Sequence, residues 1–295
     1  MQRYVIAIKA VADLFKHVGQ PTQSSLQSLK THQQQVEALP PSNSFCITFD
    51  LLPRTEVSCQ WNTKAMLGLD KVDVATYFDL IHPRWWMTYL FFSRAVYELG
   101  TIPDNGITDH AYAYQMKLPL RTANGEYTWF NQITFPGALD ERERMCSHLN
   151  IYQLDRRFEE VSILSSPLLT DGSRPVPFLV DHIQSRTEKL FLNTYLSPLK
   201  PRAQQVLYLY RKLVIDHLDD EVSSQMIAEA SNEIMPGKGI SKATVEKRNR
   251  DILACARRSS VIDHSPLVHF REVKKIARFL NAAFGPPTSA EIVGL

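Results

Sequence analysis

The fold of the first half of the chain is decided by residues 112–135, which read YAYQMKLPLRTANGEYTWFNQITF. From Tyr112 to Leu120 apolar side chains occupy every second position, and mostly polar or small side chains occupy the positions between them. This period of two predicts a β-strand with one buried face and one hydrated face. Asn124-Gly125 supplies a hairpin turn, because both residue types tolerate a positive φ angle. Tyr127–Phe135 is therefore expected to return as the antiparallel partner strand.

Further strands are expected on both sides of this hairpin. Alternation of apolar and polar residues predicts two strands before it, at Phe45–Asp50 and Val57–Trp61, and one strand after it, at Met145–Leu154. Helical spacing and stop signals predict helices after Asn62, over Val72–Leu80 and over Arg84–Leu99. The expected fold class is α+β, with an antiparallel five-stranded sheet, helices inserted after its second strand, and an all-α domain behind it.

The remaining segments are expected to be mostly helical. Residues 1–39 have helical patterning that ends at Pro40-Pro41, and this helix is either an arm for dimerisation or a cap packed on the sheet. From Leu196 onward the patterning is helical throughout. The expected domains are a helical arm at 1–41, the sheet domain at 42–155, a connecting loop and helix at 156–195, a helical domain at 196–260, and a C-terminal helix and tail at 261–295.

Composition narrows the class of protein. A formal net charge of +2, with 44% hydrophobic and 22% charged residues, is typical of a soluble globular protein. The four cysteines are scattered without the spacing of a disulfide framework or a metal site, so no metal is predicted. The apolar runs are far shorter than the roughly 20 residues that a membrane span requires, so we expect a cytoplasmic protein without membrane contact. Phosphate-loop, HExxH and GxSxG motifs are absent, so we predict neither an enzyme nor catalytic residues.

Three local features connect the sheet segment with a known family. They are Leu67-Gly68-Leu69 after the second strand, Asp79–Pro83 before the long helix, and Arg121–Trp129 across the hairpin. In this order they resemble the signatures of a PAS domain over residues 45–154. The resemblance implies that the concave face of the sheet binds a small molecule or a partner protein. The flavin-adduct motif NCRFLQ is absent, so no cofactor is predicted.

The apolar positions of the hairpin supply the candidate ligand-binding residues, which are Tyr112, Tyr114, Met116, Trp129 and Phe135. Small-molecule pockets are typically lined by apolar and aromatic side chains with a few polar groups among them. Packing of an ordinary core is the alternative interpretation of the same five residues, and the sequence alone favours it.

A second informative stretch lies at residues 238–258. Ser241 is expected to cap a helix over Lys242–Arg258, on which Val245 and Ile252 belong to an apolar stripe. Residues 238–258 contain seven Lys and Arg against two acidic residues, a surplus of five in a chain whose net charge is +2. A helix with one apolar and one basic face, preceded by a short helix and a turn, suits docking in the major groove of DNA.

This region resembles the LuxR-type helix-turn-helix family over residues 196–258. The matching residues are Leu196-Ser197-Pro198, Ile227-Ala228 and Ile240–Val245. The resemblance implies a bacterial transcription regulator that binds double-stranded DNA as a homodimer and contacts RNA polymerase. By resemblance, Glu246, Lys247 and Arg250 face the DNA, and Lys242, Thr244 and Arg248 flank it. Glu229–Gly239 is longer than the corresponding turn of the family by about a helical turn, so either the second helix is extended or the turn is enlarged.

Two further expectations concern the end of the chain and the alternative function. Residues 265–280 are expected to form another amphipathic, basic helix that packs on the domain or dimerises. The alternative to a DNA-binding regulator is a signalling interaction protein, whose PAS-like domain binds a protein partner or a small ligand without reading DNA. A steep loss of duplex binding with added salt would favour the regulator.

Overall fold

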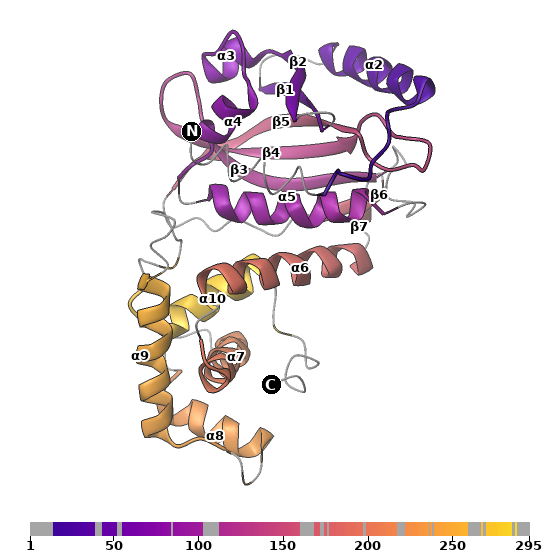
Figure 1. Cartoon of the computed structure of the whole chain (residues 1–295). Coiled ribbons are helices and arrows are strands. Elements are labelled where there is room, and N and C mark those ends of the chain that lie inside the picture. Colours follow the sequence, from indigo (N-terminus) through magenta and orange to yellow (C-terminus); the bar gives the residue numbers. More distant parts are fainter. Residues whose placement is uncertain are drawn as a thin grey trace. The chain divides into compact units, whose positions relative to one another are not determined.

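The computed structural model describes residues 14–38, 43–51, 55–83, 85–102, 112–159, 168–171, 174–175, 177–196, 199–216, 222–235, 237, 239–258, 267, 270–284 and 287. The chain forms two compact units, Met1–Thr187 and Glu188–Leu295. Figure 1 shows a sheet with helices in the first unit and helices alone in the second. Among the described residues, no helix combines the length and hydropathy that crossing a bilayer requires.

The sheet of the first unit is antiparallel throughout, with the strand order β2-β1-β5-β4-β3-β6-β7. Its five longer strands are those expected from the sequence. The strands are β1 (Ser44–Asp50), β2 (Glu56–Trp61), β3 (Tyr112–Arg121), β4 (Tyr127–Pro136), β5 (Ser147–Arg157), β6 (Leu168–Asp171) and β7 (Arg174–Pro175).

The two short strands correct the expectation of a loop in this part of the chain. Residues 168–171 form β6, which pairs with β3 from Tyr112 to Gln115, and β7 pairs with β6. The backbone of β3 would otherwise present unpaired groups at the sheet edge, and a short added strand satisfies them. The five expected strands are therefore extended to seven.

Three helices lie between β2 and β3, as expected: α3 (Thr63–Leu67), α4 (Val74–Leu80) and α5 (Trp86–Gly100). α4 and α5 cover one face of the sheet, which we call the inner face. The hydroxyls of Tyr77 on α4 and Tyr152 on β5 are 2.9 Å apart, and the Tyr97 hydroxyl of α5 lies 2.9 Å from Nε2 of His148 on β5. The even-numbered side chains of β5 near its start thus point to the inner face.

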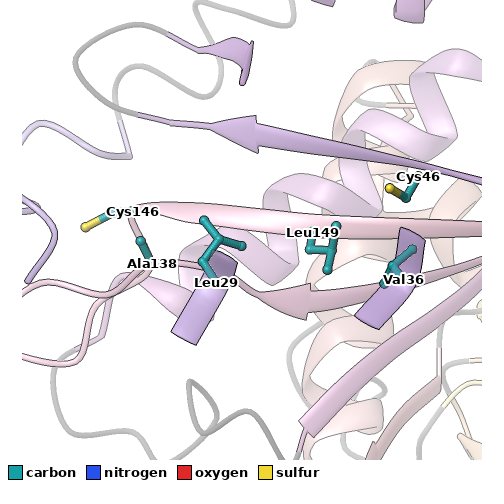
Figure 2. Packing of buried hydrophobic residues seen from close by; sticks show 6 residues of the cluster. All are labelled: Leu29, Val36, Cys46, Ala138, Cys146 and Leu149. Atoms are coloured by element: carbon teal, nitrogen blue, oxygen red, sulfur yellow. The ribbon is translucent and has the colours of Figure 1, made fainter. Parts of the chain in front are cut away.

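The outer face of the sheet is covered by α2 (Gln23–Glu37). Leu29 and Val36 of α2 are buried against Cys46 of β1 and Leu149 of β5 (Figure 2). Thr22 caps the helix, because its hydroxyl accepts a hydrogen bond from the Ser25 backbone nitrogen at 3.3 Å. Of the two alternatives for this helix, packing as a cap is the one that the structure shows. Residues 1–13 of the expected arm lie outside the described residues.

The second unit is an all-helical bundle that begins within α6 (Pro177–Tyr195). Its other helices are α7 (Pro201–Asp216), α8 (Ser224–Ile234), α9 (Lys242–Arg258) and α10 (Val273–Phe284). Phe191 of α6 packs against Phe279 and Phe284 of α10, with ring centroids 5.8 and 5.2 Å apart. The helix expected over residues 265–280 is present as α10, but it begins only at Val273 and continues to Phe284, and its apolar face lies in the core of the unit.

A buried ion pair lies inside this bundle. Arg211 of α7 donates to the carboxylate of Glu188 on α6, and the two side chains are only 5% and 8% exposed. Asn281 of α10 accepts from Arg211 Nε at 3.0 Å and donates to the Arg211 carbonyl at 2.7 Å. The polar groups of three helices are thus satisfied by one another, which is the condition for burying charge without a large loss of stability.

Candidate nucleic-acid interface and candidate cavity

The first turn of α9 is built as the sequence indicated. Ser241 Oγ accepts a hydrogen bond from the Thr244 backbone nitrogen at 3.3 Å and lies 3.0 Å from the Thr244 hydroxyl. A serine in this position satisfies one of the amide groups that a helix start leaves unpaired. The helix therefore begins at Lys242 with an exposed first turn.

One face of α9 is fixed in the core of the second unit. Val245, Ile252 and Ala256 are at most 1% exposed. These residues recur at helical spacing and pack toward α7 and α8, both of which contact α9. Burial of this face leaves the opposite face of α9 in solvent.

The exposed face carries four of the six residues expected to meet DNA, which are Lys242, Glu246, Lys247 and Arg250. Lys242 Nζ lies 4.0 Å from a carboxylate oxygen of Glu246, in a pair whose side chains are more than half exposed. No carboxylate of the described residues lies within ion-pair distance of Lys247 or Arg250. The cationic groups of these two side chains are therefore available to an external anion.

The other two expected residues have partners within α9. Thr244 is half-buried against the Ser241 cap. Arg248 is half-buried and its Nη1 donates to Asp251 at 2.8 Å. The flanking role of Thr244 and Arg248 stays a prediction, and in that role Arg248 would have to share its guanidinium between Asp251 and a phosphate.

Asn249, a half-buried residue on the side of α9 that carries Val245 and Ile252, was not among the site residues predicted from the sequence. Its amide nitrogen donates to the Tyr210 hydroxyl of α7 at 2.8 Å and to the Ser224 hydroxyl of α8 at 3.3 Å. The signal was present in the sequence, since Asn249 occupies a position of the apolar stripe that begins at Val245. A polar side chain at such a position is expected to have a hydrogen-bond partner on a neighbouring helix.

Two described residues just before α9, Gly239 and Ile240, lie against α8. α8 continues to Ile234, and the Ser231 hydroxyl, which is fully buried, accepts from the Ile240 backbone nitrogen at 3.2 Å. A Cβ atom on Gly239 would lie 2.9 Å from the Asn232 Cα, so only glycine fits this approach. α8 therefore ends at Ile234, and the described residues just before α9 lie against α8.

The inner face of the first unit encloses a small cavity. Tyr114 and Met116, two of the five candidate ligand-binding residues, line it, and its volume is about 20 Å³. The remaining lining residues include Tyr89 and Tyr97 of α5, Gln132 and Thr134 of β4, and His148 and Asn150 of β5. Such a volume has room for about one water molecule.

The other expected ligand-binding residues do not line this cavity. Direct cross-strand partners share a face, and Tyr114 and Met116 pair with Thr134 and Gln132. Trp129 and Phe135 occupy the alternate positions of β4 and therefore point away from the cavity; Trp129 packs instead against Phe158, with ring centroids 5.4 Å apart. The side chain of Tyr112 lies outside the described residues.

A chain of buried hydrogen bonds surrounds the cavity. Asn150 accepts from the Thr134 hydroxyl at 2.7 Å and donates to the Tyr152 hydroxyl at 3.1 Å, which leads on to Tyr77 and Tyr89. Three polar atoms of the lining, Tyr114 Oη, Gln132 Oε1 and His148 Nδ1, have no hydrogen-bond partner among the described residues. Burial lowers the pKa of His148 to about 3, so its ring is neutral. The lining thus combines apolar side chains with uncharged polar groups, three of whose atoms lack a hydrogen-bond partner among the described residues.

Comparisons with known proteins add little to this geometry. No family model matches the chain, and no curated protein matches it. A solved structure of the VqmA dimer from Vibrio cholerae, described in terms of the DNA-binding mechanisms of LuxR-type receptors, matches with 13% identity and a TM-score of 0.24. That match covers 90% of this chain and 92% of the VqmA chain. A likeness at this level assigns neither fold nor function. Among the described residues, no group of His, Cys, Asp and Glu side chains could hold a metal ion.

Proposed function

We propose that this chain is a transcription regulator that binds double-stranded DNA through α9. One observation carries the proposal: α9 buries an apolar face against α7 and α8 while it presents Lys247 and Arg250 to solvent without carboxylate partners among the described residues. An α-helix held in this way fits the width of the major groove.

Each side chain of the exposed face has a chemical role in this proposal. Lys247 and Arg250 donate to the O6 and N7 atoms of guanine, and Glu246 accepts from the N4 amine of cytosine. Lys242 and Arg248 contact phosphates, which position the helix without reading sequence. The Thr244 side chain flanks the contact and supports the cap at Ser241.

Binding of the full-length protein to duplex DNA tests the proposal. We expect Lys247→Ala and Arg250→Ala each to weaken binding by about 1–3 kcal/mol. Lys30→Ala removes the same charge from exposed α2 in the first unit and serves as the matched control. Unchanged affinity in both α9 variants, or binding that is indifferent to salt, would instead favour the interaction protein without DNA readout.

We further propose that the first unit is a PAS-like sensory domain whose cavity takes a compact, uncharged ligand. The unpartnered atoms of Tyr114, Gln132 and His148 support this, because buried polar groups that lack partners are costly and a ligand would supply them. The neutral His148 ring offers no countercharge to an ionised molecule. A ligand larger than water must displace the surrounding side chains, since the cavity measures about 20 Å³.

Native mass spectrometry of the purified full-length protein tests this second step. We expect a small molecule to accompany the chain, and we expect Tyr114→Phe, which removes one unpartnered atom, to reduce its occupancy. If neither the wild type nor Tyr114→Phe carries a small molecule other than water, the first unit is limited to an interaction role.

A further inference from the structure

One polar side chain interrupts the buried stripe of α9. Asn249 lies four residues after Val245 and three before Ile252, both of which are 0% exposed. Residues at this spacing share a helix face, so Asn249 is directed toward the same neighbouring helices as the core residues. Its hydrogen bonds to Tyr210 on α7 and Ser224 on α8 join α9 to both preceding helices.

These links are partly buried, since Asn249 and Ser224 are half-buried. Tyr210 is only 4% exposed, and the Oδ1 atom of Asn249 is buried without a partner among the described residues. A hydroxyl can donate or accept, so either orientation of the Asn249 amide keeps a hydrogen bond to both Tyr210 and Ser224. The connection therefore does not depend on how the amide is turned.

Stability alone does not explain an asparagine in this position. A neutral hydrogen bond contributes little net free energy to folding, whereas a buried amide oxygen without a partner is costly. Apolar contacts are non-directional and tolerate small rotations of a helix, but directed hydrogen bonds to two helices break when α9 rolls or slides. In some proteins a buried polar group selects one arrangement of helices at the expense of stability.

Small rotations matter on the exposed face of α9. Because side chains reach about 5–6 Å from a helix axis, a roll of about ten degrees moves their ends by roughly 1 Å. A displacement of this size exceeds the tolerance of a binding constellation of about 0.5 Å. The orientation of α9 thus decides whether Lys247 and Arg250 reach base edges or only the phosphate backbone.

We propose that Asn249 is a positioning residue, which fixes the roll and register of α9 against α7 and α8 and thereby sets the sequence discrimination of the protein. This inference rests on the proposed DNA-binding function. It assigns no DNA contact to Asn249 itself; the residue acts through Tyr210 and Ser224 on the direction of the exposed face.

The test compares two duplexes as probes for the full-length protein: one enriched by the wild type from a random pool, and one shuffled from the same bases. We expect Asn249→Leu to keep its affinity for the shuffled duplex and its salt dependence, while the ratio of the two affinities falls roughly tenfold. Tyr210→Phe, which removes one oxygen atom, should lower the ratio in the same direction. The double variant should lose no more than Asn249→Leu alone, because both changes remove one interaction.

Gln204→Leu, an amide-to-leucine change at an exposed position of α7, is the matched control and should leave the ratio unchanged. Equal discrimination by wild type and Asn249→Leu would overturn the positioning role while leaving the DNA-binding function intact. If Asn249→Leu fails to fold, Tyr210→Phe decides the question, and an unchanged ratio in that folded variant overturns the role. A wild type that shows no salt-dependent duplex binding would remove the proposed function, and the positioning role with it.

Discussion

At the scale of single residues, His148 on the inner face makes the stability of the first unit depend on pH. Its ordinary pKa of 6.5 is lowered to about 3 by burial, and its ring stacks on Phe49 with centroids 5.1 Å apart. As pH falls below 6.5, the unfolded chain binds a proton at His148 while the folded protein does not. The unfolded state is thereby favoured, so the stability of the first unit decreases from pH 6.5 toward pH 3.

We therefore expect His148 to reduce the free energy of unfolding by about 2 kcal/mol between pH 7 and pH 5. His148→Gln keeps a polar group beside the Tyr97 hydroxyl and should remove this part of the pH dependence. Denaturant unfolding at several pH values can be followed by tryptophan fluorescence, because all four tryptophans lie in the first unit. Parallel curves for wild type and variant would contradict the burial of a neutral His148.

Gly239, just before α9, lies at a close approach to α8. Gly239→Ala places a Cβ atom 2.9 Å from the Asn232 Cα, a backbone atom that cannot turn away. We expect a loss of about 1–3 kcal/mol, visible as faster amide hydrogen exchange in α8 and in the first turns of α9. Adding Asn232→Ala removes the nearer side-chain contact but leaves the backbone clash, so it should not restore protection. Recovery in the double variant would show that the clash involves only the side chain.

At the scale of helices, the buried pair of Glu188 and Arg211 holds α6, α7 and α10 together. Arg211→Met leaves the Glu188 carboxylate in the core without its cation, and we expect the second unit to lose about 3–5 kcal/mol. Arg211→Met combined with Glu188→Leu removes both charges and should recover most of that loss. Hydrogen exchange of α7 and α10 measures both effects. A double variant as unstable as the single one would mean that packing around Arg211, and not its charge, is responsible.

The regular elements were predictable because their signals are local. Alternation in Tyr112–Leu120, the Asn124-Gly125 turn and the serine cap of α9 each act within a few residues, and the structure contains all three. β6 was missed because residues 168–171 form a strand by pairing with the edge of β3, a distant partner. A short strand of this kind is stabilised by the sheet and carries little signal of its own.

The lining of the cavity was only partly predictable, for a related reason. The alternation rule assumes that one face of a sheet is buried, but here both faces are covered. Trp129 therefore finds a buried place on the outer face, while the polar Gln132 and Thr134 line the cavity. Which side of β4 turns inward depends on its register with β3, and in a hairpin the type and length of the turn fix that register.

At the scale of the whole molecule, charge is divided unequally between the two units. Residues 188–295 contain 16 Lys and Arg and 12 Asp and Glu, a net charge of +4, which leaves −2 for residues 1–187 in a chain of +2. A duplex is a polyanion, so its attraction to the protein should come from the second unit. Under the proposed function, the modest total charge would also limit non-specific binding, and selectivity would lie with the few exposed side chains of α9.

Because the duplex should be attracted to the second unit, the salt dependence of DNA binding can be used to count the copies of α9 that contact one duplex. Each phosphate contact contributes about 0.9 to the slope of log affinity against log salt concentration.

Lys242 is 58% exposed at the start of α9 and has the proposed role of a phosphate contact. Lys242→Ala should therefore reduce the magnitude of the slope by about 0.9 if one protomer binds and by about 1.8 if a homodimer binds. We expect the larger value, because two half-sites one helical turn apart are the usual target of a dimeric helix-turn-helix protein. Gel-shift titrations over a series of salt concentrations measure the change, and an unaltered slope would show that Lys242 does not contact phosphate.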